Sequence, residues 1–142
     1  MIKIKIQKIG DAKTPNYAHQ GDAGLDIYSA EEDYTLKPGE RKGFKTGIKM
    51  EIPKGYVALF WDKSGLAINH GIKTMGGVID STYRGEFVVI LVNLGKKDHK
   101  IEKNSKITQI LIQKVEEAEF EEAKDLSGSQ RGDGKFGSTG GK

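Results

Sequence analysis

The chain has 142 residues, of which 36% are apolar and 19 are glycine, with no cysteine and a formal net charge of +3. This length fits one domain with a modest core and many turns. The lack of cysteine excludes disulfides, zinc thiolates and cysteine nucleophiles, and the small, scattered positive charge does not indicate nucleic-acid binding. No apolar run reaches membrane-spanning length and the N-terminus lacks a signal-peptide core, so we expect a soluble, cytoplasmic protein without a nucleic-acid or membrane partner.

Short strands separated by turns are predicted along most of the chain. Leu25 and Ile27 alternate with Asp26 and Tyr28, a period typical of strands, and similar patterns recur between Pro and Gly turn signals. We expect strands within residues 1–9, 23–30, 41–52, 56–61, 87–94 and 106–115. Only residues 64–70 predict a helix, a short one with Ser64 near its N-cap. Together these elements predict an all-β fold, a jelly-roll-like barrel or sandwich.

The composition changes near the C-terminus. Six of the last 20 residues are glycine and the only aromatic among them is Phe136, so this segment cannot fold on its own. We therefore divide the chain into a domain at 1–122 and a flexible Gly-rich arm at 123–142. Glycines, hydroxyls and the cations Arg131 and Lys135 give residues 131–140 the composition of a phosphate clasp, although a disordered terminus explains that composition equally well. The pattern is not a Walker A loop, because Phe136 follows Lys135 where Ser or Thr is required.

Residues 76–87 predict a hairpin, with Asp80 and Tyr83 on or beside its turn. Functional side chains concentrate on such turns, but an Asp that caps its own turn and a Tyr that covers the hairpin explain the pattern as well. The start of the helix offers phosphate contacts from Lys63 and Ser64, or simple capping by Ser64. Asp26 alone reads as a solvent-facing strand residue.

Five segments in order carry a more specific signal. They are Ala23-Gly-Leu-Asp-Ile, Lys63-Ser-Gly-Leu-Ala, Gly77-Val-Ile-Asp-Ser-Thr-Tyr-Arg-Gly, Ile107-Thr-Gln-Ile and Arg131-Gly-Asp-Gly-Lys-Phe-Gly-Ser-Thr-Gly. In this order they resemble the five motifs of the homotrimeric dUTPase family, from about residue 20 to the C-terminus. The third and fifth segments are long and specific, whereas the first and fourth would mean little alone.

The resemblance implies a jelly-roll subunit in a homotrimer with shared active sites at the subunit boundaries, each closed by the C-terminal arm of a neighbouring subunit. It also implies Mg²⁺-dependent hydrolysis of dUTP to dUMP and pyrophosphate. This reaction keeps uracil out of DNA and supplies dUMP for thymidylate synthesis.

The resemblance further assigns roles to individual residues. Asp80 would be the catalytic base and hold the 3′-OH, while Tyr83 would lie under the deoxyribose and Phe136 would stack on uracil. Asp26 would reach Mg²⁺ through water. Backbone groups of residues 77–86 would read the uracil edge, and Gly77, Val78 and Ile79 are among the substrate-binding residues there. Phosphate contacts would come from Lys63, Ser64, Gly65, Gln109, Arg131, Ser138 and Thr139. Gly137 would also bind the substrate.

Some positions depart from the family pattern. Lys63 stands where the second motif usually has Arg, which keeps the charge but loses the bidentate fork. Asn104-Ser105-Lys106 stands where the fourth motif usually has Gly-Asp-Arg, and Thr108 replaces a small apolar residue.

Two other functions stay open. One is a dCTP deaminase on the same fold, which the Phe136 arm disfavours, and the other is a non-catalytic trimer that binds a protein or senses nucleotide.

Overall fold

The computed structural model describes residues 1–135, and the predicted contacts of Phe136, Gly137, Ser138 and Thr139 lie outside the described residues. Its only helix in this part of the chain is α1 (Ser64–His70). The strands are β1 (Lys5–Lys8), β2 (Leu25–Tyr28), β3 (Tyr34–Leu36), β4 (Arg41–Lys45), β5 (Ile48–Glu51), β6 (Tyr56–Trp61), β7 (Ile72–Met75), β8 (Val78–Ile79), β9 (Val88–Asn93), β10 (His99–Ile101) and β11 (Lys106–Lys114). The predicted all-β fold with one short helix is confirmed.

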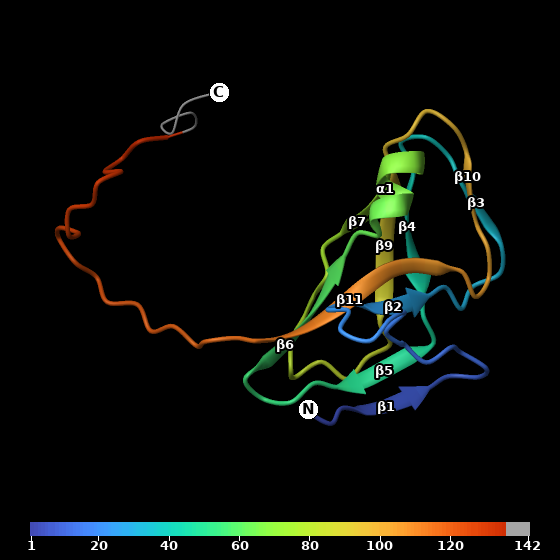
Figure 1. The fold of residues 1–142 in the computed structure, drawn as a ribbon, viewed down its shortest axis with the longest axis horizontal. Coiled ribbons are helices and arrows are strands. Elements are labelled where there is room, and N and C mark those ends of the chain that lie inside the picture. The colour runs from blue at the N-terminus through green and yellow to red at the C-terminus, as the bar shows by residue number, and fades with distance from the viewer. Residues whose placement is uncertain (136–142) are drawn as a thin grey trace.

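Two main sheets enclose the core. One has the strand order β2-β11-β6-β8 and the other β4-β9-β7, with all neighbours antiparallel, while β1-β5 and β10-β3 form two-stranded ribbons. Figure 1 shows β11 and β2 crossing the direction of β4 and β9, with the β1-β5 ribbon below them. The structure is a jelly-roll-like sandwich, as the sequence predicts.

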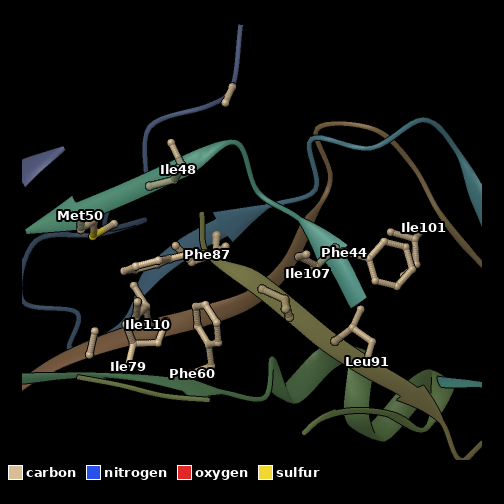
Figure 2. Packing of buried hydrophobic residues seen from close by; sticks show 14 of the residues in the cluster. Phe44, Ile48, Met50, Phe60, Ile79, Phe87, Leu91, Ile101, Ile107 and Ile110 are labelled. Carbon is tan, nitrogen blue, oxygen red and sulfur yellow. The ribbon is translucent and has the colours of Figure 1, made fainter. Parts of the chain in front are cut away.

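The core forms where the inward faces of the two main sheets meet. Phe60 and Ile110 come from one sheet and Phe44 and Leu91 from the other, and all are buried. Phe87 lies among them just before β9, with its ring edge-on to Phe60 at a centroid distance of 6.1 Å (Figure 2). Burial of each large side chain contributes about 2–3 kcal/mol to the free energy of folding. The packed core therefore holds β2, β6 and β11 in place, and these strands carry or precede the polar residues described below.

The helix occupies the predicted residues but is capped differently. Ser64 is its first residue, next to the N-cap as predicted. Lys63 holds the N-cap position without a side-chain hydrogen bond, so the alternative that Ser64 itself caps the helix is not observed. Gly71 ends the helix in a left-handed conformation with φ of 69°. A Cβ there would lie 2.5 Å from the backbone nitrogen of Gly95, so only glycine fits.

Residues 76–87 do not form the predicted hairpin. β8 pairs with β6, through Ala58 opposite Ile79, whereas β9 pairs with β4 and β7 in the other sheet. The turn itself exists, since the backbone N–H of Tyr83 donates to the Asp80 carbonyl at 3.1 Å. The segment is therefore a connection between sheets.

After β11 the chain leaves the body of the molecule (Figure 1). Residues 115–135 form no strand or helix, and the side chains of Phe120 and Leu126 are 93% and 91% exposed. Among residues 1–135 no helix has the length and apolar character needed to cross a membrane.

A histidine pair joins the helix to the β10 ribbon and predicts a pH-dependent stability. The rings of His70 and His99 lie 4.3 Å apart, and burial, followed by the neighbouring His70, lowers the pKa of His99. The unfolded chain therefore binds this proton more readily, so stability is full above about pH 6.5 and falls as the pH drops below it. The melting temperature should fall by a few degrees between pH 7.5 and 5 and fall less in His99→Gln. The exposed His19→Gln serves as control, and equal losses in all three proteins would contradict the assignment.

Candidate active site

A polar pocket of about 550 Å³ opens beside the start of α1, and we call it the lysine pocket. Lys63 and Ser64 enter it from the helix start, and Asp26 and Gln109 from the paired strands β2 and β11. Four of the predicted residues thus lie together, although they come from three segments of the sequence. Gly65, the next helical residue, does not line this pocket. The ammonium, the hydroxyl and the amide suit an anion with several oxygens, and the carboxylates of Asp22, Asp26 and Asp62 line the same pocket.

The Gln109 amide is held in place by its surroundings. Its Nε2 donates to the Asp62 carbonyl at 2.8 Å. A Cβ on Gly24 would lie 2.4 Å from Gln109 Oε1, so glycine leaves the space that this amide occupies. Asp62 is itself fixed, because its carboxylate accepts hydrogen bonds from the Thr74 N–H at 2.7 Å and from Lys73 Nζ at 2.8 Å.

Asp26 is buried, with 3% of its surface exposed, rather than solvent-facing as its strand pattern alone suggests. Lys63 Nζ lies 2.5 Å from its Oδ1, and Lys106 Nζ lies 2.6 Å from its Oδ2. Burial raises the pKa of Asp26, but the hydrogen bonds and charges of Lys106 and Lys63 outweigh burial and leave this pKa below its usual value. The carboxylate is therefore charged at neutral pH.

A second cavity, of about 200 Å³, lies against the connection between β8 and β9, and we call it the turn pocket. Its lining includes Gly77, Val78, Ile79, Asp80 and Tyr83, so the residues predicted from the third motif lie together. Gly77 has φ of 105°, and a Cβ there would lie 2.9 Å from Phe60 Cβ. This backbone conformation requires glycine and lets the segment pass close to β6, where the Phe60 N–H donates to the Gly77 carbonyl at 2.9 Å.

The Tyr83 ring is fixed although it is partly exposed. Its hydroxyl donates to the Glu86 carbonyl at 2.9 Å. A Cβ on Gly85 would lie 2.2 Å from this hydroxyl, so the ring lies over a glycine backbone. Tyr83 therefore forms a flat, rigid wall, and Asp80 stands exposed beside it.

The structure does not bring all predicted residues into one cavity of one chain. Among residues 1–135, no residue lines both pockets. Phe60 lines the turn pocket and Trp61 the lysine pocket, and successive residues of a strand point to opposite faces. Arg131 lies on the arm, where its Nε donates to the Gly134 carbonyl at 3.0 Å, and lines neither pocket.

Residues that the sequence did not single out as site residues hold these side chains in place, and two of them, Gly24 and Asp62, line the lysine pocket itself. They include Gly24, Asp62 and Lys106, and Lys106 drew notice only as a departure from the family pattern. Asn104 has φ of 64°, so it adopts the left-handed conformation that the usual glycine favours. The Thr108 hydroxyl is buried and donates to the Trp61 carbonyl at 2.7 Å, which explains how a polar residue is tolerated there.

A jelly-roll-like β domain with a polar pocket at the start of its helix and a second pocket lined by a tyrosine and a glycine-containing turn is the architecture of a class of small β proteins. The dUTPase family model matches residues 10–140. The chain belongs to the dUTPase family.

Similar proteins agree with this membership over almost the whole chain. A deoxyuridine 5'-triphosphate nucleotidohydrolase of Clostridioides difficile is 47% identical, covering 99% of both chains. Another, from Clostridium acetobutylicum, is 49% identical over 99% of this chain and 98% of its own. The solved structure of a Staphylococcus bacteriophage 80alpha dUTPase with dUPNHPP has a TM-score of 0.88 and 28% identity, covering 99% of both chains.

Proposed function

We propose that this chain hydrolyses dUTP to dUMP and pyrophosphate, keeping uracil out of DNA and supplying dUMP for thymidylate synthesis. The family match over residues 10–140 carries the proposal. The two pockets support it, because one suits a sugar and base and the other a chain of phosphates. A free nucleotide substrate fits a cytoplasmic location.

The turn pocket receives deoxyuridine. Peptide groups of Gly77, Val78 and Ile79 pair with the uracil edge, and fixed backbone donors and acceptors reject cytosine because its pattern leaves buried polar groups unpaired. The rigid Tyr83 ring lies under the deoxyribose and leaves no room for a ribose 2′-OH. Asp80 holds the 3′-OH and accepts the proton of the attacking water as pyrophosphate leaves.

The lysine pocket receives phosphates. Lys63 supplies charge, and Ser64 and Gln109 supply hydrogen-bond donors at the positive end of α1. Gly65, although it does not line the pocket in this structure, would add its backbone N–H next to Ser64. The arm adds Arg131, Phe136, Gly137, Ser138 and Thr139, with Phe136 stacked on uracil. In this proposal Asp80 carries out the proton transfer. The phosphates are bound by residues at the helix start, on β11 and on the arm.

Magnesium fits this site as an ion carried mainly by the substrate. Within residues 1–135 no three His, Cys, Asp or Glu side chains gather into a metal cage. Carboxylates do line the lysine pocket, Asp22, Asp26 and Asp62 among them, and Mg²⁺ typically binds one or two carboxylates together with substrate phosphates. Asp26 would contact the ion through water, and the bound ion would neutralise charge on the phosphate oxygens.

A homotrimer with shared sites is the assembly that these features favour. Among residues 1–135 the two pockets have no residue in common. One complete site can therefore combine the turn pocket of one copy with the lysine pocket of another. The outward face of β9 exposes Val88 and Ile90, with Met75 of β7 directly opposite Ile90. Exposed apolar rows of this kind typically mark protein interfaces. The arm at 123–142, beyond the domain at 1–122, then closes over a site of a neighbouring copy.

Incubation with dUTP and Mg²⁺ tests the proposal directly. Pyrophosphate should be released from dUTP far faster than from dCTP, dTTP or UTP, with dUMP as the other product. Ammonia release from dCTP would instead identify a deaminase. A protein that releases neither product from any of these nucleotides would contradict both enzymatic readings.

A further inference from the structure

One buried carboxylate in the lysine pocket is shared by two ammonium groups. Asp26 lies on β2, Lys63 just before α1, and Lys106 at the start of β11. Lys63 contacts one carboxylate oxygen and Lys106 the other. Apart from the Lys106 ion pair, Oδ2 has no hydrogen-bond partner among residues 1–135.

The two lysines differ in their surroundings. Lys63 and Asp26 line the pocket, whereas Lys106 does not. The Lys63 side chain is 28% exposed and that of Lys106 is 45% exposed, so both can exchange the carboxylate for another partner or for water. Lys63 is the cation positioned to meet a phosphate, and Lys106 reaches Asp26 from outside the pocket.

Binding of a triphosphate changes the neutralisation of the Asp26 carboxylate. When Lys63 turns from Asp26 to a phosphate oxygen, the buried carboxylate loses one of its two counterions. A buried charge without a partner is strongly unfavourable, so a lone Asp26 would hold Lys63 and oppose phosphate binding. A second cation that is already on the other oxygen, before the substrate and its Mg²⁺ arrive, removes this opposition.

We propose that Lys106 is a positioning residue for the phosphates: it keeps Asp26 neutralised so that Lys63 can leave the carboxylate for the substrate triphosphate. This inference rests on the proposed function. Lysine suits position 63, because its flexible stem carries a compact charge that can change partners. At position 106 only a positive charge that stays on the carboxylate is needed.

Substitution of Lys106 by Met tests the role. In the full-length protein, we expect affinity for dUPNHPP, measured by calorimetry, to fall at least tenfold, equivalent to about 1.4 kcal/mol. Affinity for dUMP should change less than twofold, because it carries one phosphate. KM for dUTP should rise with the loss of affinity while kcat changes little, and Lys106→Arg should restore dUPNHPP affinity to within about threefold, since the charge returns.

A matched control is available on the surface. Lys100 Nζ lies 2.7 Å from Asp33 Oδ2, and both side chains are about half exposed. Lys100→Met therefore removes a lysine from an ion pair of the same type outside both pockets, and it should leave dUPNHPP affinity unchanged. An equal loss in Lys100→Met and Lys106→Met would reduce the effect to net charge and overturn the proposal.

A double-mutant comparison separates positioning from direct phosphate contact. In an Asp26→Asn background no carboxylate needs a counterion, so Lys106→Met should change dUPNHPP affinity less than twofold. A tenfold loss that persists there would mean that Lys106 binds phosphate itself, which contradicts the proposal. The double variant also lacks the unpaired buried charge, so it provides a folded comparison if Lys106→Met alone is unstable.

The wild-type protein separates failure of this inference from failure of the proposed function. If wild type neither binds dUPNHPP nor hydrolyses dUTP, the proposed function is wrong. If wild type does both and Lys106→Met equals it, only the role of Lys106 is wrong.

Discussion

Asp80→Asn is expected to lower kcat for dUTP by about 10²- to 10⁴-fold, the usual contribution of a positioned general base. The amide matches the carboxylate in size but cannot accept the proton of the attacking water. Asp80 is exposed on a turn, where its backbone carbonyl rather than its side chain closes the turn to Tyr83. The substitution should therefore leave the fold intact. Pyrophosphate release measures the rate, and thermal unfolding checks the fold.

The same variant should still bind dUPNHPP with nearly wild-type affinity, because it loses the base and not the pocket. Asp98→Asn is the matched control: it removes an exposed carboxylate from the loop before β10 and should hydrolyse dUTP at the wild-type rate. Equal activity of Asp80→Asn and wild type would remove Asp80 from the chemistry and with it the mechanism proposed here.

Local patterns predicted the elements that local interactions determine. The helix at 64–70 and the strands β6, β9 and β11 follow from periodicity and turn residues within a few positions of each other. The short strands β3 and β10 pair only with each other and carry no such pattern, so they were missed. The hairpin was wrong for a related reason, since nothing within residues 76–87 reveals that β8 pairs with β6 instead of β9.

The site shows the same limit. Motif order predicted that Asp26, Lys63 and Gln109 belong to one site, and the lysine pocket brings them together. Alternation along β2 could not predict that Asp26 is buried, because its outer face is covered by distant lysines and by the backbone bridge to Asn16. Lys106 follows a turn in the sequence and acquires its role only when β11 lies beside β2.

Burial of Asp26 also explains why the two motif lysines are not interchangeable with surface lysines. An exposed ion pair contributes little, because water screens it. Asp26 is only 3% exposed, so its charge depends on the two lysines that contact its oxygens. The electrostatics of the lysine pocket therefore depend on β2 and β11 as much as on the helix.

Deletion of residues 128–142 is expected to reduce dUTP turnover by about 10²-fold or more while the remaining chain stays folded. The described part of this segment contacts neither pocket, and the core residues all precede it, so stability should not depend on it. Catalysis should depend on it because closure of an arm excludes water and completes the contacts to the phosphates. Pyrophosphate release measures turnover, the melting temperature measures stability, and gel filtration measures the state of assembly.

Phe136→Ala in the full-length chain provides the finer comparison. If the arm acts by stacking on uracil, this variant should lose much of what the deletion loses, whereas Leu126→Ala, an exposed arm residue before the fifth motif, should lose little. A truncated protein that turns over dUTP at the wild-type rate would contradict the closing role of the arm. If the truncated protein instead elutes with fewer subunits than the full-length protein, the arm holds the assembly together. The residues of the body, which precede the arm, are the same in both proteins.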